Sequence, residues 1–309
     1  MLYYFLATLL PIDKFIGKLY PLFGVVLVLM AVMVGSAIIG KPQYIMPEIQ
    51  FRNFHPDNLE IFPFMFVTVA RGAISGFHAT QSPMIAKCIT GERQGRKVFY
   101  GAMICEAVIA LIWAAGVTYY GSPKGLQSMI SSLGQSSVVY DISTGLLGIL
   151  GGALAVVGVV VCPITSGDTA FRSARPILSE WTGLDQKMIR NRLVITIPLL
   201  VAGSLLTQMD FNALWRYFSW TNQTLAMISL WISTSYLVKQ GKGLWPLITA
   251  IPASFMTSVS VTYILMAPER FRLGGAVAYW AGLVAAAGLF VYYLIWSRRA
   301  ANTDSLAKA

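Results

Sequence analysis

Long apolar stretches recur along the chain and restrict its possible folds more than any other sequence feature. They fall at roughly 20–40, 61–84, 98–120, 144–163, 193–207, 219–238, 244–266 and 274–296, with a partial stretch at the N-terminus. A helix needs about 20 apolar residues to cross a bilayer. Charged residues make up only 12% of the sequence, too few to cover the surface of a soluble protein. The sequence therefore predicts an all-α, polytopic membrane protein with about eight transmembrane helices plus a partial N-terminal one.

The basic residues support this count of spans. If successive spans alternate in direction, sixteen of the 23 Lys and Arg residues fall on one side of the membrane, six on the other, and Arg71 inside a span. The positive-inside rule places the richer side in the cytoplasm. We therefore expect a transmembrane domain at 1–296 and a cytoplasmic C-terminal tail at 297–309. The net charge of +10 reflects orientation in the lipid bilayer, and no nucleic-acid partner is expected.

The segment ARGAISGFHATQSP, residues 70–83, places polar side chains inside the second apolar stretch. On a helix, Arg71, Ser75, His78 and Ser82 would share one stripe. A charge at the bilayer centre costs roughly 2.5–3.5 kcal/mol on insertion scales, so this stripe must face protein or water.

The two glycines of this segment allow two interpretations. Gly72 and Gly76 form a small-xxx-small pattern that lets membrane helices approach closely. The same glycines also lower the cost of local unwinding. Unwound helices occur at membrane depth where they line a cavity, and transporters use them to bind substrates and ions. The second interpretation predicts at least one discontinuous helix.

Glu106 is the clearest acidic residue within a predicted span. It lies about eight residues into its apolar stretch, roughly 12 Å from the cytoplasmic end at 1.5 Å per residue. A buried carboxylate there could simply hydrogen-bond a neighbouring helix. It could also accept protons during transport, because burial raises the pKa of a carboxylate towards neutrality.

The segment CPITSGDTAFRSARP closes the fourth predicted span. Pro163 and Gly167 are expected to break the helix there, and the polar residues that follow could cap a new helix. The alternative is a cytoplasmic gate or ion site, whose oxygen ligands would be Thr165, Ser166 and Asp168. Arg172 and Arg175 could pair with Asp168 or simply hold the cytoplasmic surface.

The segment WRYFSWTNQTLA opens the sixth predicted span. Trp215 and Trp220 are typical of an aromatic belt at the membrane interface. Asn222, Gln223 and Thr224 continue into the membrane and could line a pathway. The sequence carries no nucleotide-binding, metalloprotease or serine-hydrolase motif, so we expect no enzyme activity, no cofactor and no metal site.

Five blocks of the sequence resemble those of the carbon starvation protein A (CstA) family, in the order found there. They are LATLLPIDKFIGKLYPLFG, ARGAISGFHATQSPMIAKC, GRKVFYGAMICEAVIALIWAA, CPITSGDTAFRSARPIL and DFNALWRYFSWTNQTLA. Family members carry a substantial N-terminal half before the first block, so the resemblance implies an N-terminally incomplete chain. They also usually have a small residue where this chain has Arg71, which could alter substrate preference towards carboxylates or impair function.

The resemblance implies a bacterial inner-membrane secondary transporter linked to carbon starvation. Its substrates would be small carboxylate-bearing nutrients, peptides or pyruvate, coupled to a proton or sodium ion. The family is grouped with the amino acid–polyamine–organocation (LeuT-like) superfamily, whose broken helices meet at a midplane site. An alternative hypothesis is a membrane sensor or assembly fragment that transports nothing.

We hypothesise the following roles for the residues singled out above. Gly72 and Gly76 permit the helix break. Substrate or ion contacts come from Arg71, Ser75, His78 and Gln81. Glu106 carries a proton. The gate or ion site contains Thr165, Ser166 and Asp168.

Overall fold

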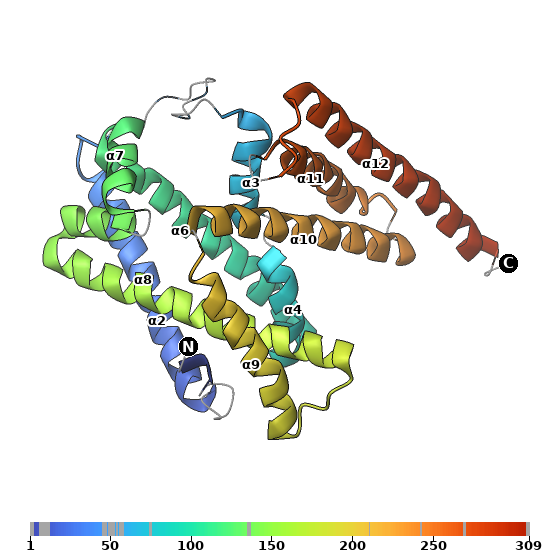
Figure 1. Cartoon of the computed structure of the whole chain (residues 1–309), viewed down its shortest axis with the longest axis horizontal. Coiled ribbons are helices and arrows are strands. Elements are labelled where there is room, and N and C mark those ends of the chain that lie inside the picture. The colour runs from blue at the N-terminus through green and yellow to red at the C-terminus, as the bar shows by residue number, and fades with distance from the viewer. Residues whose placement is uncertain are drawn as a thin grey trace. The chain divides into compact units, whose positions relative to one another are not determined.

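The computed structural model of the chain is helical, and its described residues contain no β-strand. The structure describes residues 3–5, 13–44, 48, 53, 55, 59–73, 76–134, 137–209, 211–241, 243–267 and 270–306. The principal helices are α2 (Asp13–Ile39), α3 (Ile61–Ala73), α4 (Gly76–Cys88), α6 (Ala102–Gly116), α7 (Pro123–Leu133), α8 (Ser137–Thr182), α9 (Ile189–Leu206), α10 (Phe211–Lys239), α11 (Leu247–Met266) and α12 (Gly275–Leu306) (Figure 1). A short helix α5 (Glu92–Gly95), a π-helical turn (Arg96–Gly101) and a 3-10 turn (Val117–Tyr120) flank α6.

Within the described residues, six helices are long and apolar enough to cross a membrane. They are Pro21–Ile39, Glu92–Tyr120, Ser137–Gly158, Ile189–Leu206, Leu247–Met266 and Gly275–Arg299. Each overlaps one of the predicted spans. α10 covers the further prediction at 219–238 and is 29 residues long, but its many polar side chains leave it less apolar than these six. Helix α12 continues to Leu306, past the end expected near residue 296.

The predicted second span is described in two parts. Helix α3 ends at Ala73 and α4 begins at Gly76, while residues 74 and 75 lie outside the described part of the chain. The expected discontinuity at this point therefore stays a prediction. At the start of α3, Phe62 has an extended backbone, and the Tyr279 hydroxyl of α12 donates a hydrogen bond of 3.1 Å to the Phe62 carbonyl oxygen.

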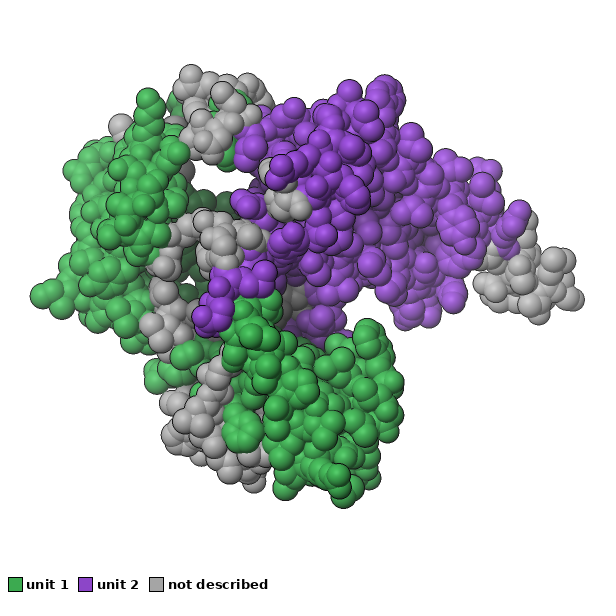
Figure 2. All heavy atoms as spheres, in the orientation of Figure 1, with its two compact units in different colours: residues 1–56, 84–206 green, residues 57–83, 207–309 purple. Residues whose placement is uncertain are grey.

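The chain divides into two compact units, which Figure 2 distinguishes by colour. Unit 1 comprises residues 1–56 and 84–206, and unit 2 comprises residues 57–83 and 207–309. The core of unit 1 forms where α2 packs against α8, with Met30, Val34 and Ile142 almost fully buried. Burial of such side chains contributes about 1.5–3 kcal/mol each relative to exposure in water, but within lipid the gain comes mainly from close packing.

Unit 2 is built from α3, α10, α11 and α12. Helix α11 is its centre, because it packs against each of the other three. Gly282 of α12 lies against the Ser258 carbonyl of α11, where a Cβ atom would come within 2.8 Å of the oxygen. Small residues allow membrane helices to approach this closely and to gain packing contacts that lipid cannot supply.

The expected break at Pro163 and Gly167 is wrong. Helix α8 is helical through both positions and ends only at Thr182, so Ser166 and Asp168 lie inside a helix and cap nothing. The interruption of α8 lies earlier, at Gly148, whose φ of 64° and ψ of −147° are non-helical. Glycine adopts this positive φ without the steric cost that a Cβ atom would impose.

Candidate functional site

The start of α4 packs closely against α10 in unit 2. Gly76 is buried, and a Cβ atom there would overlap the carbonyl oxygen of Asn222 and lie 2.8 Å from the Leu225 Cβ atom. Only glycine permits so close an approach. The packing interpretation therefore holds for Gly76. The structure brings together two segments that the sequence presented separately, ARGAISGFHATQSP and WRYFSWTNQTLA.

Polar contacts join α10 to α11 along their interface. We call Trp220, Gln223, Trp231, Thr257 and Ser260 the polar seam. The Gln223 side-chain amide donates to the Ser260 hydroxyl at 3.2 Å, and the Trp220 indole N–H donates to the Ser260 carbonyl at 3.2 Å. Further along, the Trp231 indole N–H donates to the Thr257 hydroxyl at 3.1 Å.

Gln223 is the residue of the seam whose hydrogen bonding is incomplete. Its side chain is fully buried, and its Oε1 oxygen has no hydrogen-bond partner within the described residues. An unsatisfied buried acceptor costs roughly 1–3 kcal/mol, and polar groups at membrane depth normally face protein partners or a water-filled path. The oxygen is therefore a candidate contact for a donor group or cation.

The structure describes only some of the residues that the sequence predicted to contact substrate in the segment 70–83. Gln81 is buried, with 5% of its surface exposed, and His78 is partly exposed. The Ser82 hydroxyl donates to the His78 carbonyl at 2.6 Å, a bond within α4. Arg71 and Gly72 belong to α3, but the Arg71 side chain and all of Ser75 lie outside the described residues.

Glu106 is in α6 of unit 1, and its side chain is exposed in this chain. The expectation that the carboxylate is buried is therefore wrong. The helical segment that contains it runs from Glu92 to Tyr120, so it is longer than the apolar stretch at 98–120. The depth of Glu106 in the membrane stays a prediction.

Asp168 is buried and forms an ion pair with Arg172, one turn later on α8, at 2.9 Å. This confirms the pairing that the sequence allowed. Tyr4 packs nearby: its ring lies against Gly167 and 5.1 Å from the Phe171 ring. Ser166 is exposed, and the Thr165 side chain lies outside the described residues. The oxygens expected to act as a gate or ion site are thus partly committed, because Arg172 occupies the Asp168 carboxylate.

Two further arginines extend this basic region beyond the apolar part of α8. Burial lowers the pKa of Arg175, and the positive charges of Arg192 and Arg172 lower it further. The Arg192 side chain donates to the Gln186 carbonyl at 2.6 Å, which ties α9 to the segment before it. The cluster shows that α8 and α9 hold positive charge in partly buried positions where their connection turns.

Sequence reasoning missed the α11 half of the polar seam. The signal was present in TSVSVT, residues 257–262, where hydroxyl residues recur in an otherwise apolar helix. It also missed the interruption at Gly148, because that glycine is one of several in an apolar stretch and nothing local distinguishes it from Gly145, Gly151 or Gly152.

Among the described residues, the regular elements are all helical and six helices are apolar and long enough to cross a membrane, which supports a multi-pass membrane protein. The family model described as carbon starvation protein CstA matches residues 1–136 and 121–263. The chain belongs to this family, as its sequence blocks predicted.

Several curated proteins resemble the chain. An uncharacterized protein of Haemophilus influenzae is 47% identical over 124 residues, covering 40% of this chain and 88% of that protein. The peptide transporter CstA of Escherichia coli is 25% identical, covering 65% of this chain and 39% of the transporter. The peptide transporter CstA of Mycobacterium tuberculosis is 26% identical, covering 71% and 38%. The chain thus spans about two fifths of these transporters. No solved structure matches it.

Proposed function

We propose that the chain acts in an inner-membrane secondary transporter of small carboxylate-bearing nutrients, peptides or pyruvate, driven by protons. Family membership and the relatives named as peptide transporters support the class of protein. The observation that carries the proposal is the buried Gln223 oxygen in unit 2, which has no partner within the described residues. A purely structural seam would gain by satisfying that oxygen, whereas a pathway benefits from leaving it to a ligand.

The polar seam supplies neutral hydrogen-bonding groups, which suit a substrate that must bind and then leave. Gln223 and Ser260 offer an acceptor and a hydroxyl without a fixed charge that would trap an ion. His78 and Gln81 lie on α4, whose first residue packs on α10 beside the seam. In the proposal, these two side chains contact the substrate, Gly76 sets the spacing of the helices, and Gly72, Ser75 and Arg71 complete the site.

The proposed proton path involves Glu106. A carboxylate within a membrane span is costly in contact with lipid, so its presence favours a role at a wet or protein-covered face. Thr165, Ser166 and Asp168 would act at the cytoplasmic end of α8. There the ion pair of Asp168 with Arg172 would have to open for the carboxylate to bind a cation. In the proposal the C-terminus lies in the cytoplasm, and the positive-inside pattern of the sequence supports this orientation.

The test is uptake of radiolabelled dialanine and pyruvate into proteoliposomes with an imposed pH gradient. Because the chain spans about two fifths of its transporter relatives, the assay uses it both alone and coexpressed with the N-terminal segment of a relative. Gln223→Leu should lower uptake at least tenfold and a protonophore should abolish it. Thr234→Val, which alters a buried hydroxyl pair elsewhere on the same interface, serves as the matched control.

Three results would contradict the proposal. Uptake that is unchanged in the Gln223→Leu, His78→Ala and Glu106→Gln variants would refute the proposed site. Uptake that ignores the protonophore would remove proton coupling. Absence of uptake both by the chain alone and by the chain coexpressed with the N-terminal segment would favour the alternative, a membrane protein that senses or assembles without transporting.

A further inference from the structure

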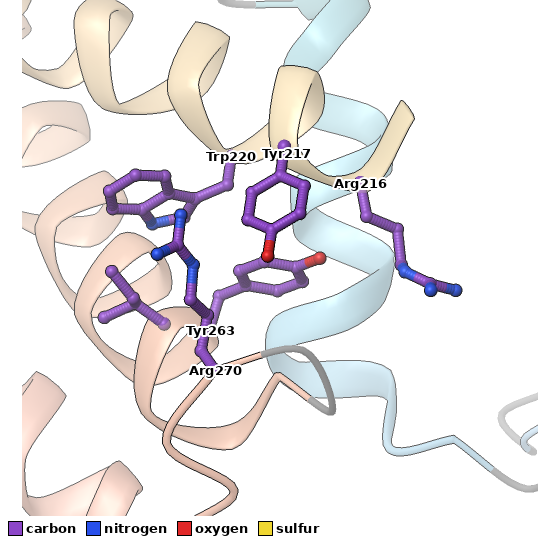
Figure 3. Close-up of a pocket in the computed structure, with 6 residues that line it drawn as sticks. Arg216, Tyr217, Trp220, Tyr263 and Arg270 are labelled. Atoms are coloured by element: carbon purple, nitrogen blue, oxygen red, sulfur yellow. The ribbon is translucent and has the colours of Figure 1, made fainter. Parts of the chain in front are cut away.

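A small hollow lies at one end of unit 2 and shares Trp220 with the polar seam. It forms where α10 begins, α11 ends and the connection to α12 follows (Figure 3). The lining residues are Arg216, Tyr217, Trp220, Tyr263, Ile264 and Arg270, and the hollow they form is small and partly open to solvent. We call this the Arg270 hollow.

Arg270 is held in the hollow by aromatic rings. Its guanidinium lies 4.6 Å from the centre of the Tyr217 ring and 5.7 Å from that of Trp220. The Trp220 ring is itself fixed, because its indole N–H donates to the Ser260 carbonyl. Cation–π contacts of this kind orient a guanidinium through its face. The N–H groups on its edge remain available to a ligand.

The charge of Arg270 is not neutralised by a neighbour in the structure. Within the described residues, no carboxylate forms an ion pair with it, and its side chain is exposed. Arg216 adds a second positive charge at the rim and points away from Arg270 (Figure 3). A hollow that combines a fixed guanidinium with aromatic walls attracts a planar anionic group that is bonded to an apolar group.

We infer that the Arg270 hollow binds a carboxylate group, with Arg270 as its principal ligand. The fork of N–H donors on a guanidinium matches the two oxygens of a carboxylate. Because the hollow is small and open on one side, a carboxylate group would meet Arg270 there while the rest of a short acid or of a peptide stays outside. The inference rests on the proposed function for its role, which is to capture substrate at this end of unit 2. Arg270 and Arg272 are two of the six Lys and Arg residues on the side that the positive-inside rule predicts to be external.

The test measures equilibrium binding to the purified full chain in nanodiscs of zwitterionic phosphatidylcholine. The probes are radiolabelled pyruvate, dialanine and dialanine amide, which differs from dialanine by lacking a free carboxylate. Pyruvate and dialanine represent the two sources of the group, a free acid and a peptide terminus. We expect at least one of them to bind, and the amide to bind at least tenfold more weakly than dialanine if the peptide is the ligand.

Variants of the connection between α11 and α12 then locate the site. Arg270→Gln should weaken carboxylate binding at least tenfold, because it removes the charge and the donor fork. Arg270→Lys keeps the charge and the cation–π contact but loses the fork, so it should give an intermediate loss. Arg272→Gln makes the same charge change in the same connection without lining the hollow, and it should leave binding unchanged. Thermal unfolding of each variant reports whether it folds. If Arg270→Gln does not fold, the binding measured with Arg270→Lys decides the question.

Failure of both pyruvate and dialanine to bind would overturn the inference, as would equal binding to the wild type and the folded Arg270 variants. These outcomes are separable from failure of transport. Carboxylate binding that depends on Arg270 in a chain that never supports uptake would keep the site and refute the transport function. Uptake by a protein whose carboxylate binding does not depend on Arg270 would support the transport function and refute the site.

Discussion

The two units bury polar groups in different ways. In unit 1, Asp168 is paired with Arg172 one turn away on the same helix, so the two charges neutralise each other locally. In unit 2, Gln223 is neutral and depends on Ser260 of another helix, and its amide oxygen has no partner within the described residues. The Asp168 carboxylate has its charge partner on the same helix, whereas the Gln223 oxygen in the seam has no partner in the part of the chain that the structure describes. Unit 1 also buries hydroxyls that have no partner within the described residues, at Ser143 and Thr144. The comparison therefore favours the polar seam over the Asp168 pair for substrate contact, and it does not rank the two units as wholes.

Removing one member of the ion pair should have the greatest effect on stability. Asp168→Ala leaves Arg172 as a partly buried charge without its partner, and breaking a buried pair costs about 3 kcal/mol or more. Because the Arg172 side chain is 24% exposed, we expect the loss in the free energy of unfolding to stay near about 3 kcal/mol. Equilibrium unfolding in mixed micelles measures the change.

The double variant Asp168→Leu with Arg172→Leu separates a structural role from a functional one. Replacing both charges with apolar groups should recover most of the lost stability. If uptake recovers as well, Asp168 is structural and the gate assignment is wrong. If stability recovers and uptake does not, Asp168 takes part in transport.

Adding a single methyl group at Gly76 should be the next most damaging change. Gly76→Ala introduces a Cβ atom that overlaps the Asn222 carbonyl, and overpacking of this kind costs about 1–3 kcal/mol. The matched control is Gly288→Ala in α12, where a Cβ atom meets nothing within 4 Å. That substitution should leave the free energy of unfolding unchanged or raise it slightly. Equal losses at both positions would contradict the close approach of α4 to α10.

The hydrogen bond within the seam should contribute least to stability. A double-mutant cycle of Gln223→Leu and Ser260→Ala should give a coupling energy near 0.6 kcal/mol, the average for interhelical bonds in a membrane protein. A comparable cycle on Thr234 and Thr249, whose hydroxyl oxygens lie 2.8 Å apart, provides the reference. We expect similar coupling energies but a loss of uptake only for the first pair. A loss at both pairs would mean that the interface matters to transport solely through its packing.

The sequence predicted the local features of the candidate site well. The pairing of Asp168 with Arg172 was accessible because residues four apart share a helix face. The close-packing pattern at Gly76 was also visible, although its partner was not. The prediction that Pro163 and Gly167 break the helix was wrong, because the helix-breaking tendency of these residues is a weak preference that tertiary context overrides.

By itself, the sequence determined that this is an all-helical, multi-pass membrane protein of the CstA family, because apolar spans and local motifs are properties of adjacent residues. Only the tertiary structure decided that Gly76 meets Asn222, that Gln223 meets Ser260, and that Arg270 stacks on Tyr217. These contacts join residues from different helices. Many pairings of apolar helices bury similar surface, and the choice among them depends on close packing and hydrogen bonds that no single segment encodes.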